Sequence, residues 1–169
     1  MKSHGSGERP WKFREVGTGV VFEPGVLVFH PENIVIGDNV YIGHNSIIKG
    51  YFKNELIIGS GTWIGQQCFF HSAGGLFIGN DVGIGPGVKI ITSSHDLNTE
   101  RELPIVRRAV RFAPTTIGAG SDIGVGAVLL PGIELGDRVQ VGAGAVVTKS
   151  FPGNSILTGV PARKIGEVP

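Results

Sequence analysis

The 169-residue chain is long enough for one domain with a buried core, and its 28 glycines are unusual beside 41% hydrophobic and 17% charged residues. A net charge of +1 gives no basic field of the kind that binds nucleic acid, and two Trp and two Tyr form no extended stacking surface. A single cysteine excludes an internal disulfide framework and is typical of a reducing compartment.

The N-terminal residues carry Lys2, Arg9 and Lys12 but lack the apolar stretch of a secretory signal peptide. The chain also lacks the run of about 18 apolar residues that a membrane-spanning helix needs. We therefore expect a cytoplasmic protein with no membrane span, in which residues 1–25 form an irregular segment.

A six-residue repeat, apolar-x-Ile-Gly-x-x, begins near residue 34, and we call the central apolar residue of each unit its marker. The markers recur every six positions in five groups of three: Ile36, Ile42 and Ile48; Ile58, Ile64 and Phe70; Ile78, Ile84 and Ile90; Ile117, Ile123 and Leu129; Leu135, Val141 and Val147. Three six-residue faces make an 18-residue coil, and coils must stack because one coil cannot bury its own interior. The sequence thus predicts an all-β, single-stranded parallel β-helix of five 18-residue coils over residues 26–150.

Markers and the residues two positions before them should point inward, as the alternation of a strand requires. Cys68 stands two residues before Phe70, so we expect it to be a core residue and not a nucleophile. Helix should be scarce, at most a turn after Pro161.

The repeat is interrupted only after the third face of a coil, and the longest insertion is an excursion over residues 92–113. Glycine follows the marker on the first two faces of every coil but not on the third. One corner of the predicted prism therefore carries every insertion. Long irregular loops on a rigid scaffold are typical sites of function.

His95 lies in the long excursion, and the unperturbed pKa of a histidine side chain, about 6.5, suits a general base at neutral pH. The alternative is a surface histidine beside Asp96. His71 follows the third marker of the second coil, so it should lie at the same corner, as an acceptor contact or as a plain turn residue. We predict an acceptor site from His71, Gln67 and Asp96. Four arginines crowd the excursion without a role that the pattern reveals, namely Arg101, Arg107, Arg108 and Arg111.

Three features together resemble one family: the repeat, the serine-rich lead-in to SHDL at residues 94–97, and the closing VVTKSFPGNSILTGVPARKIGEV. They are similar to the left-handed β-helix acyltransferases, among them the galactoside, maltose, nodulation-type and polysaccharide-locus sugar O-acetyltransferases. The resemblance covers residues 34–168. It implies a left-handed coil, a homotrimer with active sites between neighbouring prisms, acetyl-CoA as cosubstrate, a sugar-like acceptor and no metal.

In that family the loop histidine, here His95, is the general base for direct acetyl transfer to a hydroxyl. The last residues, 151–169, would form a short tail that contacts CoA, whose phosphates attract Arg and Lys. The positions that match acetyl-CoA contacts are Val125, Ala143, Thr148, Lys149, Arg163 and Lys164. Taken alone, Lys149 and Arg163 could equally be ordinary surface cations.

One departure affects the acceptor, because Gly65 stands where the sugar O-acetyltransferases have an asparagine. N-acetylation of an amino-sugar is therefore an alternative. A second is a zinc enzyme like the γ-carbonic anhydrases, although His44, His71 and His95 include no closely spaced pair. A third is a non-catalytic β-helix scaffold.

Overall fold

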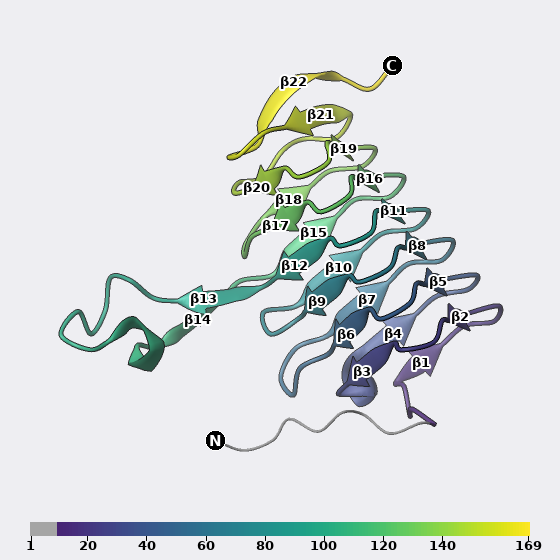
Figure 1. The fold of residues 1–169 in the computed structure, drawn as a ribbon, viewed down its shortest axis with the longest axis horizontal. Helices are drawn as coiled ribbons and strands as arrows, with labels where there is room; N and C mark the ends of the chain where they lie inside the picture. The colour runs from purple at the N-terminus through teal and green to yellow at the C-terminus, as the bar shows by residue number, and fades with distance from the viewer. Residues whose placement is uncertain (1–9) are drawn as a thin grey trace.

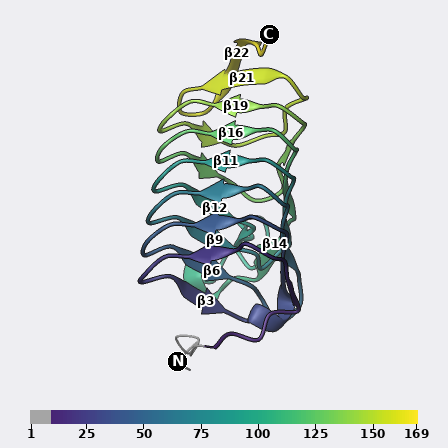
Figure 2. The ribbon, with the colours of Figure 1, turned by 90° about the vertical axis from the view of Figure 1, so that its right-hand side faces the viewer.

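The computed structural model describes residues 10–169 as a stack of coils with three parallel sheets for sides, from which one long hairpin projects (Figure 1). The view in Figure 2 shows the coils stacked one above the other, with the two described ends of the chain at opposite ends of the stack. Residues 1–9, which include His4, Lys2 and Arg9, lie outside the described residues. Within the described part no helix is long and apolar enough to cross a membrane.

Each sheet collects one face from successive coils. The first sheet has the order β1 (Glu15–Val16), β4 (Ile34–Ile36), β7 (Leu56–Ile58), β10 (Leu76–Ile78), β15 (Thr115–Ile117) and β18 (Glu134–Leu135). The second has β2 (Val21–Phe22), β5 (Tyr41–Ile42), β8 (Trp63–Ile64), β11 (Gly83–Ile84), β16 (Asp122–Ile123), β19 (Gln140–Val141), β21 (Ser155–Thr158) and β22 (Arg163–Glu167). The third has β20 (Val146–Val147), β17 (Val128–Leu129), β12 (Lys89–Ile91), β9 (Phe69–His71), β6 (Ile47–Lys49) and β3 (Leu27–Phe29).

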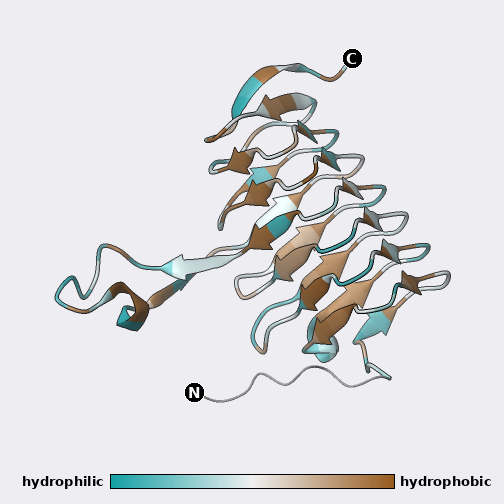
Figure 3. Cartoon of the chain, in the orientation of Figure 1, coloured by the Kyte–Doolittle hydropathy of each residue, from teal (hydrophilic) through white to brown (hydrophobic). Residues whose placement is uncertain are grey.

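The predicted inward positions are confirmed. Every marker residue is buried, and none is more than 3% exposed. The markers also pair with one another, as Ile58 does with Ile36 on one side and with Ile78 on the other. Each marker therefore packs in a column that runs the height of the prism, and Figure 3 shows the body strands coloured mostly as hydrophobic. Cys68 is buried as predicted, and burial raises the pKa of its thiol.

The predicted number of five coils is too low, because the sheets contain six, eight and six strands. An additional coil precedes the first group of markers: Val16 pairs with Ile36, Phe22 with Ile42 and Val28 with Ile48. Residues 15–25, expected to be irregular, thus contain β1 and β2. This coil keeps the six-residue spacing, but Glu23 stands where glycine follows the second marker of every other coil, so the pattern missed it.

The C-terminal tail also differs from expectation. The turn of helix expected after Pro161 is instead β22, which pairs antiparallel with β21 and covers the end of the second sheet. The helical segments among the described residues are two short 3-10 turns, η1 (Pro31–Asn33) and η2 (Ile105–Arg107).

Two corners matter for the site. We call the turns between the second and third sheets the open corner, and the turns between the third and first sheets the insertion corner. All three insertions leave at the insertion corner, after β6, β9 and β12, as predicted. The longest contains the hairpin of β13 (Ser93–His95) and β14 (Val110–Phe112).

Candidate active site

The hairpin is firmly attached to the prism at its root. The Thr92 hydroxyl donates a hydrogen bond of 2.7 Å to the carbonyl of His71 and accepts one of 2.8 Å from the Gly74 amide. Beyond the hairpin the stack resumes in register, because Leu76 on β10 pairs with Thr115 on β15. The excursion therefore leaves the coils undisturbed, and the β13–β14 hairpin projects away from the body (Figure 1).

The two faces of the hairpin look toward different parts of the prism. Ser93 is opposite Phe112, Ser94 is opposite Arg111, and His95 is opposite Val110. Opposite residues of an antiparallel pair share a face and successive residues alternate. His95 and Phe112 therefore lie on one face, and Ser94 and Arg111 lie on the other.

His95 is half-buried, and its Nδ1 lies 3.1 Å from the carbonyl oxygen of Arg108. A carbonyl oxygen can only accept, so in the neutral ring Nδ1 carries the hydrogen and Nε2 keeps its lone pair. This is the tautomer that a general base needs. The ring is also held in orientation by a backbone group.

Arg108 organises the loop around that carbonyl. Its guanidinium donates hydrogen bonds to three carbonyl oxygens, those of Leu103 (2.9 Å), Arg101 (2.9 Å) and Leu97 (3.3 Å). The next residue, Ala109, donates its amide to the Glu100 carboxylate at 2.9 Å. The sequence pattern gave Arg108 no role, since a hydrogen bond to a backbone carbonyl leaves no mark on residue type.

His71 lies at the same corner, within what we call the corner aromatic cluster of Tyr51, Phe52, His71 and Phe112. The Tyr51 ring is central, with its centroid 4.6 Å from Phe52, 5.7 Å from His71 and 6.0 Å from Phe112. Sequence reasoning found His71 but not its aromatic neighbours, which come from the insertion after β6 (Tyr51 and Phe52) and from β14 (Phe112).

A cavity of about 370 Å³ lies on the other side of the hairpin, toward the C-terminal coils. Its polar wall contains Thr148, one of the predicted acetyl-CoA positions, together with Ser94 and Arg111, which were not predicted as site residues. The remaining wall is mostly apolar and includes Ile91 and Leu130. Such a mixed cavity suits a chain with amide groups along an alkyl body.

Two other predicted cofactor positions, Val125 and Ala143, stand at the open corner. Val125 is 56% exposed, and Ala143 lies one coil above it, since the Gly144 amide bonds to the Val125 carbonyl at 2.8 Å. Gly126 and Gly144 have φ of 68° and 67°, and a Cβ on either would meet nothing within 4 Å.

Left-handed backbone alone does not require glycine there, because Gln67 occupies the equivalent turn position at φ 57°. The glycines therefore leave the surface bare beside Val125 and Ala143. From Val125 to Leu130 the chain runs five residues across the third sheet, or about 16 Å at 3.3 Å per residue. The open corner and the cavity thus lie on opposite edges of that sheet.

The remaining predicted residues make local contacts. Lys149 Nζ lies 5.4 Å from the centre of the Phe151 ring, and Arg163 donates to the Ala162 carbonyl at 3.0 Å. Lys164 pairs with Glu167 at 2.8 Å and thereby lowers the pKa of that carboxyl. Asp96 accepts a 2.8 Å bond from the Asn98 amide, as in an Asx turn. None of these contacts joins one of the four residues to His95.

Two further positions bear on the alternatives. Among residues 10–169 no three His, Cys, Asp or Glu side chains gather as metal ligands would, and His44 pairs instead with Glu23 at 3.4 Å. A Cβ at Gly65 would lie 2.6 Å from the backbone nitrogen of Pro86. No side chain can therefore stand at position 65 without displacing the next coil.

The chain was compared with known proteins. A family model for the hexapeptide repeat of succinyl-transferase matches residues 33–50 and 114–149. A protein of Dictyostelium discoideum, provisionally named as an acetyltransferase, is 33% identical over 159 residues, which are 93% of this chain and 70% of that protein. Galactoside O-acetyltransferase of Escherichia coli K12 is 30% identical over 158 residues, 92% of this chain and 64% of the enzyme. The chain belongs to the hexapeptide-repeat acyltransferase family.

The solved structures agree on the fold. A mutant of AntD, an N-acyltransferase from Bacillus cereus, in complex with dTDP and coenzyme A, superposes with a TM-score of 0.82 at 24% identity, covering 92% of this chain and 84% of that one. A galactoside acetyltransferase in complex with coenzyme A superposes with a TM-score of 0.66 at 29% identity, covering 93% of this chain and 66% of that one. The chain spans between 55% and 64% of the length of curated relatives from Schizosaccharomyces pombe, Saccharomyces cerevisiae and E. coli.

Proposed function

We propose that this protein is an acetyl-CoA-dependent acetyltransferase that acetylates a hydroxyl of a sugar-containing acceptor, with His95 as general base. The observation that carries the proposal is the bond from His95 Nδ1 to the Arg108 carbonyl, which leaves Nε2 as the proton acceptor. The names of relatives and the coenzyme A complexes of structural neighbours support the same chemistry. A cytoplasmic location, expected from the single cysteine, belongs to this proposal.

The reaction is a direct transfer. His95 Nε2 takes the proton of the acceptor hydroxyl while the oxygen bonds to the thioester carbonyl carbon. The carbon–sulfur bond then breaks, and the proton passes from His95 to the departing sulfur of CoA. A well-placed general base accelerates such a step by about 10²- to 10⁴-fold. Cys68 takes no part, since it is buried in the core.

The predicted acetyl-CoA positions are divided between the bare open corner, with Val125 and Ala143, and the cavity with Thr148, on opposite edges of the third sheet. We therefore propose a homotrimer in which the open corner of one prism, with Val125 and Ala143, faces the hairpin side of its neighbour. Lys149, Arg163 and Lys164 would meet the nucleotide phosphates, and Gln67 and Asp96 would border the acceptor. Sedimentation should then give three times the chain mass.

An amino-sugar is the second candidate acceptor, because position 65 offers no side chain where the O-acetyltransferases have asparagine. Release of free CoA thiol is followed with matched acceptors that differ only in one group, such as methyl glucoside and methyl glucosaminide. Faster release with the hydroxyl compound supports O-acetylation, whereas release with the amine alone assigns N-acetylation.

The general base is tested with His95→Ala. We expect kcat to fall by about 10²- to 10⁴-fold while the Kd for acetyl-CoA stays unchanged. His30→Asn is the matched control, since His30 adopts a left-handed backbone that Asn tolerates and pairs only locally with Glu32. Near-normal turnover in His95→Ala would remove this histidine from the mechanism. If CoA does not raise the melting temperature of the wild type, acetyl-CoA is not the cosubstrate.

A further inference from the structure

The corner aromatic cluster contains two exposed rings, Phe52 and Phe112, and two half-buried ones, Tyr51 and His71, and none of the four belongs to the core. Phe52 and Phe112 are 58% and 45% exposed, although each ring lies close to Tyr51. The inward positions of the coils are already filled by the markers. A surface of adjoining aromatic rings at this corner therefore needs an explanation other than folding.

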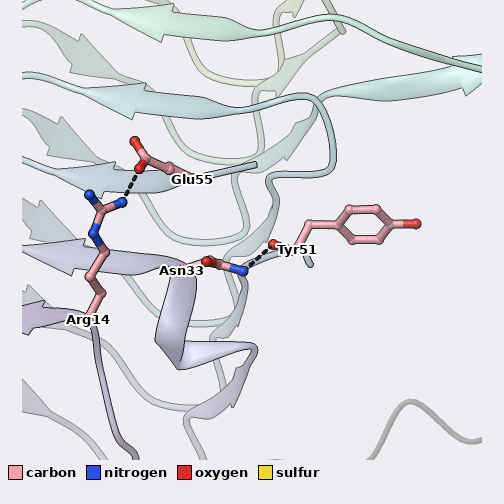
Figure 4. Close-up of polar contacts among 4 residues, drawn as sticks. All are labelled: Arg14, Asn33, Tyr51 and Glu55. Atoms are coloured by element: carbon pink, nitrogen blue, oxygen red, sulfur yellow. Dashed lines mark hydrogen bonds and ion pairs between the residues drawn. The ribbon is translucent and has the colours of Figure 1, made fainter. Parts of the chain in front are cut away.

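The loop that carries Tyr51 is anchored. The Asn33 amide donates a 2.8 Å hydrogen bond to the Tyr51 carbonyl, and Arg14 forms an ion pair with Glu55 at the end of the same insertion (Figure 4). Figure 4 also shows the Tyr51 ring directed away from Asn33 and from the coil. The backbone is held while the ring is presented outward, as in a binding surface that is formed in advance.

The cluster is continuous with His95. Phe112 lies opposite Ser93, and His95 follows two residues later on the same face of the hairpin. Two residues of a strand span about 6.6 Å. The imidazole therefore stands beyond the edge of the aromatic surface by about the length of one sugar ring.

We infer that the corner aromatic cluster binds the acceptor as a pyranose ring, stacked by its apolar C–H face on Tyr51 and Phe112 with a hydroxyl directed to His95 Nε2. The acetylation of that hydroxyl rests on the proposed function, whereas the binding of the sugar ring does not. A pyranose suits the site because its faces carry C–H groups that an aromatic ring attracts, while its hydroxyls radiate from the edge. The other occupant that stacks on exposed rings is a nucleobase.

Binding is tested without turnover, by saturation-transfer NMR on the full chain. The probes are the methyl pyranosides of galactose, glucose, mannose and N-acetylglucosamine, with uridine as the nucleobase probe. We expect saturation of the C–H protons on one face of at least one pyranoside. The signal should be lost in Phe112→Ala, kept in Phe112→Tyr, and kept in Trp63→Leu, an exposed aromatic of the second sheet.

Tyr51→Leu is a second variant in case Phe112→Ala disturbs the hairpin. With any pyranoside that is turned over, both variants should raise the KM for the sugar by about 2- to 13-fold, the value of one aromatic contact, and leave the KM for acetyl-CoA unchanged. Absence of pyranoside saturation in the wild type, or its persistence in both variants, contradicts the inference. So does cluster-dependent saturation of uridine alone.

The two proposals fail in different ways. If pyranoside binding depends on Phe112 but the wild type releases no thiol from acetyl-CoA, the sugar site is supported and acetyl transfer is refuted. Thiol release with the same sugar KM in wild type and both variants would support acetyl transfer and refute the sugar site at the corner aromatic cluster.

Discussion

The carbonyl oxygen of Arg108 accepts the Nδ1 hydrogen of His95 at 3.1 Å, while the Arg108 side chain bonds to three carbonyls of the loop between them. One residue thus shapes the loop with its guanidinium and orients the candidate base with its backbone. We therefore expect the position of the imidazole to depend on the Arg108 side chain, which holds the loop that carries this carbonyl.

Loss of that side chain should misplace the base. We expect Arg108→Ala to lower kcat by up to about 10²-fold, the cost of a misplacement of about 1 Å, while the KM for acetyl-CoA changes little. Arg108→Lys should recover part of the rate, because an ammonium reaches one or two of the three carbonyls. Arg107→Ala is the matched control in the same loop. Equal kcat in wild type and Arg108→Ala would show that His95 is oriented by other means.

The open corner gives a test of the proposed acetyl-CoA site. Gly126→Asn should fold, since Asn tolerates a left-handed backbone and a Cβ at that position meets open space. The new side chain should instead raise the KM for acetyl-CoA several-fold in thiol-release assays. An unchanged KM would place acetyl-CoA elsewhere.

Glycine at the turns between the first and second sheets is required for a different reason, which is the close stacking of neighbouring coils. A Cβ at Gly118 would lie 2.3 Å from the carbonyl carbon of Gly136 on the next coil. We expect Gly118→Ala to force the coils apart and lower the denaturation midpoint strongly, whereas Gly126→Asn lowers it only slightly. Similar midpoints for the two variants would contradict the close stacking of coils at Gly118.

The marker columns should dominate stability. Ile84 is fully buried in the second sheet, so Ile84→Ala should cost about 2–5 kcal/mol in the free energy of unfolding. Val106 is 76% exposed on the excursion, and Val106→Ala should change that free energy by no more than about 0.5 kcal/mol. Urea denaturation measures both. A small effect at Ile84 would mean that the column tolerates a cavity.

Acid should weaken one turn of the N-terminal coil. Asp38 accepts hydrogen bonds from the amide and hydroxyl of Thr18, which lower the pKa of its carboxyl. A lowered pKa means that the stabilisation is complete above the unfolded-state value and is lost as pH falls through the folded-state value. Asp38→Ala should therefore melt earlier than wild type at pH 7, with the gap closing in acid. A gap that is constant with pH would exclude this carboxylate as its source.

Much of the fold could be predicted because the six-residue period directly records which side chains are buried. The first coil was missed because, although Val16, Phe22 and Val28 keep the spacing, Phe22 is followed by Glu23 and not by the expected glycine. The extended tail was missed because β22 owes its conformation to antiparallel pairing with β21, which no local pattern encodes.

The candidate site was predictable only in part. His95 was accessible because a long insertion in a strict repeat is visible in the sequence, and imidazole chemistry is specific. Tyr51 and Phe112 are 61 positions apart and meet only because coils stack, and Arg108 acts partly through a backbone atom that every residue has. Such relationships can be recognised only in the three-dimensional structure.

The register across the excursion has an evolutionary consequence. Leu76 and Thr115 pair as neighbouring coils do elsewhere, as though residues 93–112 were absent. Hairpins of other lengths and sequences can therefore replace this one without a change in the packing beneath. The shape of the excursion and the packing of the coils are thereby encoded in separate stretches of the chain, so selection can alter one and preserve the other.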